Sequence, residues 1–335
     1  MRQHAVSESI GVGHYFPDEV VKSDELMSEF DSERRFGLPF RYLSTLAGIE
    51  ERRWAPSGTK PSELAIEASK MAIERADILP HEIDCILYCG IERDWQEPAT
   101  AHQVQHTLGA TRAMCMDVGN ACHGFMNGLG IADAFIANGT ARVCLVCTGE
   151  IGSVVARRFV EQLKQPDCGK SDLKLLIGGL TVGDAGAAML LRRAEGGAGF
   201  KQFKFESNGA YTHLCQYSHA ANDEIYGEMH MEEICKATLS YQANTIGDTY
   251  RSLAWDPSDV DRLICHQVGS RAHRQVCRLA DVSPDCAPVS VRQFGNIASA
   301  TIPALISLNP PAKGDKVLIL SSGSGMTIGQ SAMIA

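Results

Sequence analysis

The stretch Pro80-His-Glu-Ile-Asp-Cys-Ile-Leu-Tyr-Cys89 occurs a second time in the chain, as Pro257-Ser-Asp-Val-Asp-Arg-Leu-Ile-Cys-His266. Proline, an acidic residue, an aliphatic residue, aspartate and two further aliphatic residues recur in the same register. Two more pairs follow in the same order: Gly119–Cys122 with Gly295–Ala298, and Arg142–Gly149 with Lys316–Gly323. Three ordered matches at nearly one spacing predict two duplicated halves, because self-similarity at a fixed period marks a repeated structural unit.

Each half is predicted to run helix, strand, glycine–asparagine turn, helix, strand. Residues 62–78 place small and aliphatic residues at helical spacing. The strand at 84–89 is almost continuously apolar, which is typical of a sheet with helices on both faces. The glycine-rich segment 122–137 predicts a central helix that is packed tightly on all sides, because glycine lowers the intrinsic stability of a helix.

These patterns predict an α/β fold with an N-terminal half at 1–180 and a C-terminal half at 181–335. The 335 residues exceed the size at which a single hydrophobic core usually stops growing, so two related halves are plausible. Residues 151–180, which include the polar stretch 161–170, are predicted to form an insertion or lid between the halves rather than core.

The composition is typical of a soluble globular enzyme, and we expect a cytoplasmic location. Hydrophobic residues make up 44% of the chain, charged residues make up 21%, and the formal net charge is −9. This negative charge argues against a general nucleic-acid or anionic-membrane partner. We expect no signal peptide and no membrane span, because no apolar run approaches the roughly 18 residues that a span requires.

The twelve cysteines are spread along the chain, and several lie in apolar strand-like runs. Buried free thiols in a reducing compartment fit this distribution better than disulfides. Cys144 and Cys147 form a C-x-x-C pair inside an apolar run, so we expect a buried strand there rather than a metal site. We expect neither a metal nor a bound cofactor.

Three reactive residues occupy matching places in the two halves. Cys122 begins the first central helix, Asn296 lies in the equivalent turn of the second half, and His266 mirrors Cys89 at a strand end. Active sites of α/β proteins gather at such strand ends and helix N-termini. We expect the helix dipole to lower the pKa of the Cys122 thiol below about 8.5, which would favour a nucleophilic thiolate.

His266 and Asn296 would each donate a hydrogen bond to the negative oxygen of an enolate. Taken singly, the three residues also fit a buried thiol, a strand-end histidine and a turn asparagine. The duplication is what suggests that they share one site.

Five motifs resemble those of the beta-ketoacyl-ACP synthase III family of the thiolase superfamily. They are Asp117-Val-Gly-Asn-Ala-Cys122-His-Gly-Phe around the nucleophile, His266-Gln-Val-Gly-Ser-Arg271, Gly295-Asn296-Ile-Ala-Ser-Ala-Thr-Ile-Pro303, the mid-chain turn Gly183-Asp184-Ala-Gly-Ala-Ala, and the glycine loop Ser322-Gly-Ser324-Gly-Met-Thr-Ile-Gly329. The resemblance covers the chain nearly end to end. It implies a five-layered αβαβα thiolase fold that is usually a homodimer.

The resemblance also implies roles for individual residues. The backbone N–H groups of Cys122 and Ser324 would form the oxyanion hole for acyl transfer, and His266 with Asn296 would form a second hole for the enolate. Arg271 would lie near the mouth of the pantetheine tunnel, where an acidic acyl carrier protein or CoA binds. Arg274 would either join it or lie on a solvated helix face.

Several positions depart from the family pattern. Val268-Gly269 replaces the usual Ala-Asn, Cys265 replaces the usual proline before the histidine, and Tyr42 and Leu46 stand where initiating synthases tend to place tryptophan and arginine. These changes weaken the case for a housekeeping initiator of fatty-acid synthesis.

Glu97, immediately before Pro98, is a further departure, because initiating synthases usually carry an apolar residue there. OleA-like members, which join two acyl chains head to head, are similar here, with a glutamate that reaches a partner subunit's active site. Such a carboxylate would abstract an α-proton if burial raised its pKa. The alternative is a glutamate that interacts with the dipole of the following helix.

The sequence therefore predicts an acyltransferase that carries out a ping-pong Claisen condensation. Cys122 would take an acyl group from CoA or a carrier protein, and a second acyl or malonyl thioester would attack it to give a β-keto product in fatty-acid, specialised-lipid or secondary-metabolite synthesis. The alternatives are acyl transfer to oxygen or nitrogen, a cysteine hydrolase with the Cys–His–Asn order of papain-like proteases, and a subunit of a heterodimeric synthase.

Overall fold

Two sheets with the same strand order form the body of the protein in the computed structural model, which describes residues 6–219 and 225–335. The first sheet runs β1 (Ser7–Tyr15), β7 (Asp184–Arg193), β6 (Val143–Ile151), β4 (Cys85–Tyr88) and β5 (Met114–Asp117). The second runs β8 (Gly199–Tyr211), β13 (Gly325–Ile334), β12 (Lys316–Gly323) and β11 (Arg262–Cys265). In both sheets the first two pairings are antiparallel and the third is parallel. This shared topology confirms that the chain is built from two related halves.

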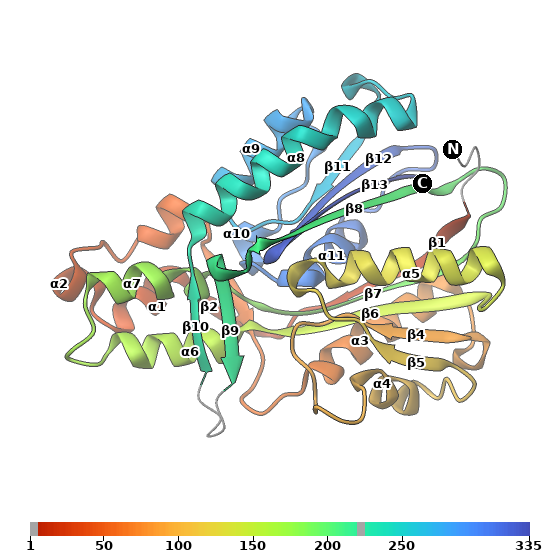
Figure 1. Ribbon diagram of the computed structural model, residues 1–335. Helices are drawn as coiled ribbons and strands as arrows, with labels where there is room; N and C mark the ends of the chain where they lie inside the picture. Colours follow the sequence, from red (N-terminus) through yellow and green to blue (C-terminus); the bar gives the residue numbers. More distant parts are fainter. Residues whose placement is uncertain (1–5, 220–224) are drawn as a thin grey trace.

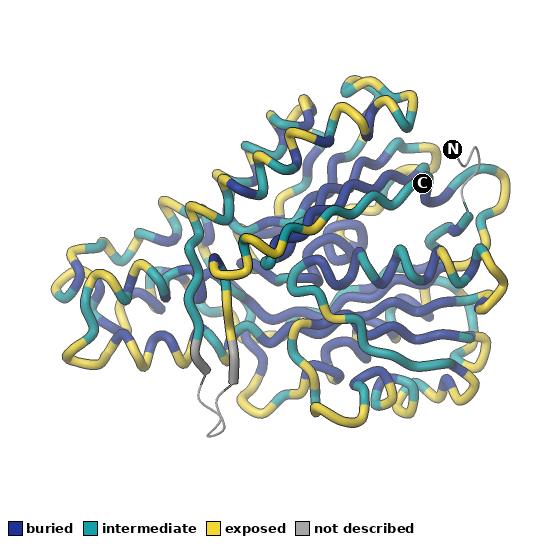
Figure 2. Tube along the Cα trace, viewed as in Figure 1, coloured by how far each residue is buried: buried dark blue, intermediate teal, exposed yellow. Residues whose placement is uncertain are grey.

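Helices and sheets alternate in five layers (Figure 1). One outer layer contains α3 (Pro61–Ala76) and α4 (Thr100–Leu108), and the other contains α8 (Met231–Leu253) and α9 (Ser270–Ala280). The middle layer, between the sheets, contains α5 (Gly124–Asn138) and α11 (Thr301–Leu308). The inner strands are largely buried, whereas the outer helices show exposed residues along their lengths (Figure 2). The αβαβα thiolase architecture expected from the sequence is confirmed.

The central helix α5 needs its glycines because the strands of the first sheet lie directly against it. A Cβ atom at Gly128 would come within 2.4 Å of the Cys89 Sγ, and one at Gly124 would come within 2.6 Å of the Cys89 carbonyl oxygen. Both separations are far below van der Waals contact. The core around α5 and α11 joins the two sheets, and it includes Leu87 of β4, Leu129 of α5, Ile264 of β11, Leu305 of α11 and Ile319 of β12.

The sequence motifs align the two halves with an error of one residue relative to the structure. The short 3₁₀ helices η3 (Ala121–His123) and η8 (Ala298–Ala300) are equivalent, and each begins with an alanine at positive φ, 44° at Ala121 and 46° at Ala298. Cys122 therefore corresponds to Ser299 and not to Ala298. The Gly-Asn dipeptides misled the alignment, because the second half has one more residue between its asparagine and the alanine.

The boundary between the halves also differs from the one expected after residue 180. Strand β7, at Asp184–Arg193, pairs with both β1 and β6 of the first sheet, and the second sheet begins with β8 at Gly199. The division therefore falls at residues 194–198. A sheet is completed by its backbone hydrogen bonds, and motif spacing did not reveal that the first sheet closes with a strand after the insertion.

The insertion joins other segments in a cap at one end of the molecule. Its helices α6 (Gly152–Leu163) and α7 (Lys170–Leu176) pack with α1 (Ser23–Glu29) and α2 (Ser32–Phe36) around a separate apolar cluster that includes Leu26, Phe30, Phe159, Leu163 and Leu173. The β9/β10 hairpin (Cys215–His219 and Ile225–Met229) and the pair β2 (Glu19–Lys22) and β3 (Glu51–Trp54) complete this region. Within the described ranges, no helix combines the length and apolar character needed to cross a membrane.

Candidate active site

Cys122, His266 and Asn296 line one cavity of about 100 Å³. Cys122 lies in η3 at the start of α5, His266 follows the last residue of β11, and Asn296 lies in the turn before η8. The opposite wall comes from the start of α8 and from the strands before it, and includes Met229, Met231, Ile234 and Cys235. The two halves thus bring the three predicted side chains together, as the duplicated turns suggested.

The amide of Asn296 has a defined orientation. Its Oδ1 accepts a hydrogen bond from the backbone N–H of Ala298 at 3.0 Å, so its Nδ2 remains the donor. The backbone around it is fixed by Asn296 N donating to the Thr181 oxygen at 2.9 Å and by Gly183 N donating to the Asn296 oxygen at 3.1 Å. Gly295 permits this approach, because its φ is 67° and a Cβ there would come within 2.6 Å of the Thr181 oxygen.

His266 is held as a neutral imidazole. Burial lowers its pKa to about 4, and a hydrogen bond with the backbone of Ala298 opposes this shift only in part. Its Nδ1 is buried and has no hydrogen-bond partner among the residues that the structure describes. A neutral imidazole with an unused ring nitrogen can donate or accept a proton at a reacting oxygen or sulfur.

The pKa of Cys122 is shifted in the direction opposite to the one expected from the helix dipole. Burial raises it, and the charges of Glu150 and Cys215 raise it further. The dipole effect is worth about 1 kcal/mol or less and falls off within one helical turn, so desolvation of the thiolate outweighs it. The Cys122 side chain is therefore a thiol at neutral pH.

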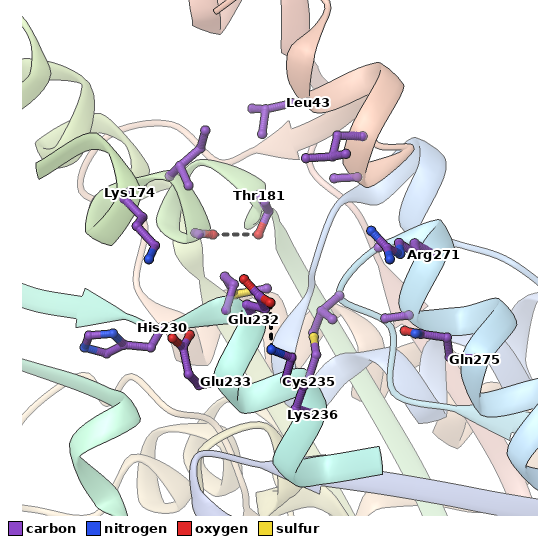
Figure 3. A pocket seen from close by; sticks show the side chains of 18 of the residues that line it. Leu43, Lys174, Thr181, His230, Glu232, Glu233, Cys235, Lys236, Arg271 and Gln275 are labelled. Atoms are coloured by element: carbon purple, nitrogen blue, oxygen red, sulfur yellow. Dashed lines mark hydrogen bonds and ion pairs between the residues drawn. The ribbon is translucent and has the colours of Figure 1, made fainter. Parts of the chain in front are cut away.

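A wider pocket of about 540 Å³ adjoins the cavity. The two share wall residues Met231, Cys235, Leu239, Val268 and Ala272, so the pocket forms a mouth that leads toward Cys122. Figure 3 shows Lys174 on one side of this mouth and Arg271 on the other, with the ion pair between Lys236 and Glu232 between them at 2.7 Å. Arg274 lies exposed on α9 and does not line the pocket.

Of the other predicted site residues, Ser324 shares the cavity with the three and Glu97 does not. Ser324 follows β12 and faces the same cavity. Glu97 is exposed in this single chain and is not part of the cavity wall. The start of the following helix is capped instead by Asp117, whose carboxylate accepts from the backbone N–H groups of Thr100 and Ala101 at 2.9 and 3.0 Å.

Sequence reasoning missed Glu150, which is 3% exposed at the end of β6. Burial raises its pKa to about 7, and hydrogen bonds from Ser299 and Thr148 make this rise smaller. An available signal was its place in Thr-Gly-Glu at the end of an apolar strand, since carboxylates are rarely fully buried without a specific partner. Cys215, which lines the cavity with Cys122, was missed as well.

The family models for 3-oxoacyl-[acyl-carrier-protein] synthase III match residues 116–159, and those for its C-terminal part match residues 251–334. The first match contains Cys122, and the second contains His266 and Asn296. The beta-ketoacyl-[acyl-carrier-protein] synthase III of Clostridium botulinum is 29% identical over 97% of both chains, and that of Oceanobacillus iheyensis is 28% identical over 97% of both.

The chain is similar to the synthase III condensing enzymes over nearly its whole length. Structures of Xanthomonas campestris OleA overlay on 98% of both chains with a TM-score of 0.91, at 24% sequence identity. That likeness concerns the fold. The protein is an acyltransferase of the condensing type.

Proposed function

We propose that the enzyme forms a carbon–carbon bond by a ping-pong Claisen condensation on Cys122. The Cys122 sulfur attacks an acyl thioester, and CoA or carrier-protein thiol leaves with the proton. The enolate of a second thioester then attacks the acyl–Cys122 carbonyl, which expels the sulfur and gives a β-keto product. The observation that carries the proposal is the convergence of Cys122, His266 and Asn296 on one cavity that opens into a wider mouth.

The two negative oxygens of this reaction would be held at different places. Backbone N–H groups of Cys122 and Ser324 would stabilise the tetrahedral oxyanion of acyl transfer. Neutral His266 and the free Nδ2 of Asn296 would stabilise the enolate, and the Ala298 hydrogen bond that fixes the amide supports this role. Holding such donors in place before reaction lowers the barrier, because no reorganisation is needed as charge develops.

The mouth pocket supports a thioester with a long polar arm. Its cations Lys174, Lys236 and Arg271 suit the phosphates of CoA or an acidic acyl carrier protein, and the apolar walls nearer Cys122 suit the pantetheine arm. Arg274, exposed one turn away on the same helix, would contribute only to the outer surface. The β-keto product would enter fatty-acid or specialised-lipid synthesis.

The source of the enolate is either loss of CO2 from a malonyl thioester or removal of an α-proton by a carboxylate. Because Glu97 is exposed in the single chain, it would act as that base only across a subunit interface, in the cavity of a second copy. Strand β5 lies at the edge of its sheet and is only partly buried, which supports a homodimer paired at this edge.

Mass spectrometry of the intact protein and of its product tests the proposal. The purified chain is incubated with an acyl-CoA, with and without malonyl-CoA. We expect an acyl adduct on the Cys122 peptide and a β-keto product. Product without malonyl-CoA supports the proton-abstraction route through Glu97, and strict dependence on malonyl-CoA supports decarboxylation. Absence of any adduct on Cys122 would overturn the proposed function.

A further inference from the structure

A buried group of polar side chains lies between the two halves, outside the cavity wall. The Glu150 Oε1 accepts hydrogen bonds from the hydroxyl of Thr148 at 2.6 Å and from the hydroxyl of Ser299. The two hydroxyls also lie 2.8 Å apart, and the other carboxyl oxygen accepts from the backbone N–H of Ile91 at 3.4 Å. No basic residue pairs with Glu150 in the described part of the chain.

Ser299 connects this carboxyl to the residues proposed to hold the enolate. It directly follows Ala298, whose N–H donates to the Asn296 side chain and whose backbone also bonds His266. The Ser299 hydroxyl reaches the Cys89 carbonyl oxygen as well, at 3.2 Å. A side chain that restrains Ser299 therefore restrains the backbone that orients both donors.

The same group is linked to the nucleophile. The Cys89 carbonyl oxygen packs under Gly124, two residues after Cys122. The titratable groups that face Glu150 are Cys122 on η3, Tyr88 and Cys89 at the end of β4, and Glu92 in the loop after β4. Among these interactions, the ionised carboxyl raises the pKa of Cys122, second only to burial.

We propose that Glu150 is a positioning residue that fixes the turn carrying Asn296 through Ser299, and that its charge acts on Cys122, which is linked to the same group through the Cys89 carbonyl and Gly124. The inference rests on the proposed function, because it gives Cys122 the role of nucleophile. Glu150 itself does not reach the cavity, so it acts through Ser299 and through its charge. Above neutral pH, where the carboxyl is ionised, its charge adds to burial in raising the pKa of Cys122.

The rate of Cys122 alkylation by iodoacetamide, followed on its peptide from pH 5.5 to 9, tests the charge. The variant Glu150→Gln keeps an acceptor oxygen for Ser299 but carries no charge. We expect it to react as wild type below about pH 6, where Glu150 is already neutral, and about tenfold faster above pH 8, since removing a near charge shifts a pKa by about one unit or more. Glu67→Gln, an exposed glutamate on α3 paired with Lys70, is the matched control and should follow wild type.

A merely structural role for Glu150 would change the alkylation rate by the same factor at every pH, and that outcome would overturn the proposal. If Glu150→Gln fails to fold, the wild type alone decides: the logarithm of its alkylation rate should rise less steeply around pH 7 than on either side. A straight line of unit slope there contradicts the inference.

The hydrogen-bonding part has its own test in Ser299→Ala. We expect kcat for condensation to fall about tenfold with KM unchanged, while acylation of Cys122 falls less than twofold, because only the enolate donors lose their support. Equal loss in both half-reactions would overturn the link through Ser299. If wild-type enzyme forms no acyl–Cys122, the proposed function fails instead, independently of these variants.

Discussion

The turns at η3 and η8 have the same backbone and carry different chemistry. Each begins with an alanine at positive φ, Ala121 in one half and Ala298 in the other. The next residue is Cys122, which faces the cavity, in the first turn, and Ser299, which is 2% exposed and hydrogen-bonded to Glu150, in the second. Duplication therefore supplied two equivalent positions, of which one faces the cavity and the other is hydrogen-bonded inside the protein.

The residues that follow the two equivalent strands differ in the same way. His266, after β11, lines the cavity, whereas Cys89, after β4, is fully buried and packs against Gly128 of α5. The proposed catalytic set would thus take its nucleophile from one half and its two enolate donors from the other. The cavity lies between the halves, where side chains from both can line it.

The largest effect on activity is expected when Cys122, the residue of the first turn that faces the cavity, is replaced. Cys122→Ala should lower turnover by at least about 1,000-fold and abolish acyl labelling, because no other group carries the acyl chain. Steady-state assays and intact-mass measurements check this. Cys235→Ala, which changes another thiol of the same cavity wall, should retain the acyl adduct. An adduct that persists in Cys122→Ala would assign the nucleophile elsewhere.

Asn296→Ala should lower condensation by about 100- to 1,000-fold, the usual cost of losing one oxyanion donor. Acyl loading on Cys122 should change less than about threefold, because a different oxyanion hole serves that step. Product analysis beside single-turnover acylation separates the two half-reactions. Survival of product formation would favour acyl transfer to oxygen or nitrogen over carbon–carbon bond formation.

Glu150, the buried hydrogen-bond partner of Ser299, should make the free energy of unfolding depend on pH. Burial raises the pKa of Glu150 from its ordinary value of 4.5 to about 7, so the folded state prefers the neutral form. Its contribution is complete below pH 4.5 and is lost as pH rises through about 7. Wild type should therefore lose about 3 kcal/mol of unfolding free energy relative to Glu150→Gln between pH 4.5 and 8. Urea unfolding of both proteins across this range provides the measurement, and parallel curves would contradict it.

The mouth offers a smaller contrast between two arginines of one helix. Arg271→Ala should raise KM for the CoA or carrier-protein thioester about 3- to 10-fold with little change in kcat, because a cation at the pocket wall contributes about 1 kcal/mol to a phosphate or carboxylate contact. Arg274→Ala, exposed outside the pocket, should change KM less than about twofold. Equal effects of the two changes would move the binding surface outward on α9.

The smallest expected effect is the change in stability when the positive-φ alanine of each turn is replaced by glycine. Ala121→Gly and Ala298→Gly should each stabilise the protein by about 0.5–1 kcal/mol, since glycine adopts positive φ without the steric cost that alanine bears. Thermal unfolding of the two single variants should give similar shifts. A gain in one half and a loss in the other would show that the two turns are not equivalent in strain.

Much of the site was predictable from short motifs, because reactive residues at strand ends and helix starts keep their neighbours in sequence. Cys122, His266 and Asn296 each lie beside such a local signature, and so their meeting in one cavity followed from the duplication. Glu150 had no comparable signature, because its importance depends on Ser299, 149 residues away in the sequence. The predicted direction of the Cys122 pKa shift was wrong for the same reason, because burial is a property of the packed molecule.

By itself, the sequence determined the two halves, the αβαβα layering and the three side chains of the proposed site. Apolar periodicity, turn residues and repeated motifs are local, and local patterns set which segments become strands and helices. Only the tertiary structure decided that β7 completes the first sheet, that Ser299 is the counterpart of Cys122, and that the nucleophile rests as a thiol. These depend on strand pairing, backbone register and desolvation, which arise only when distant segments pack together.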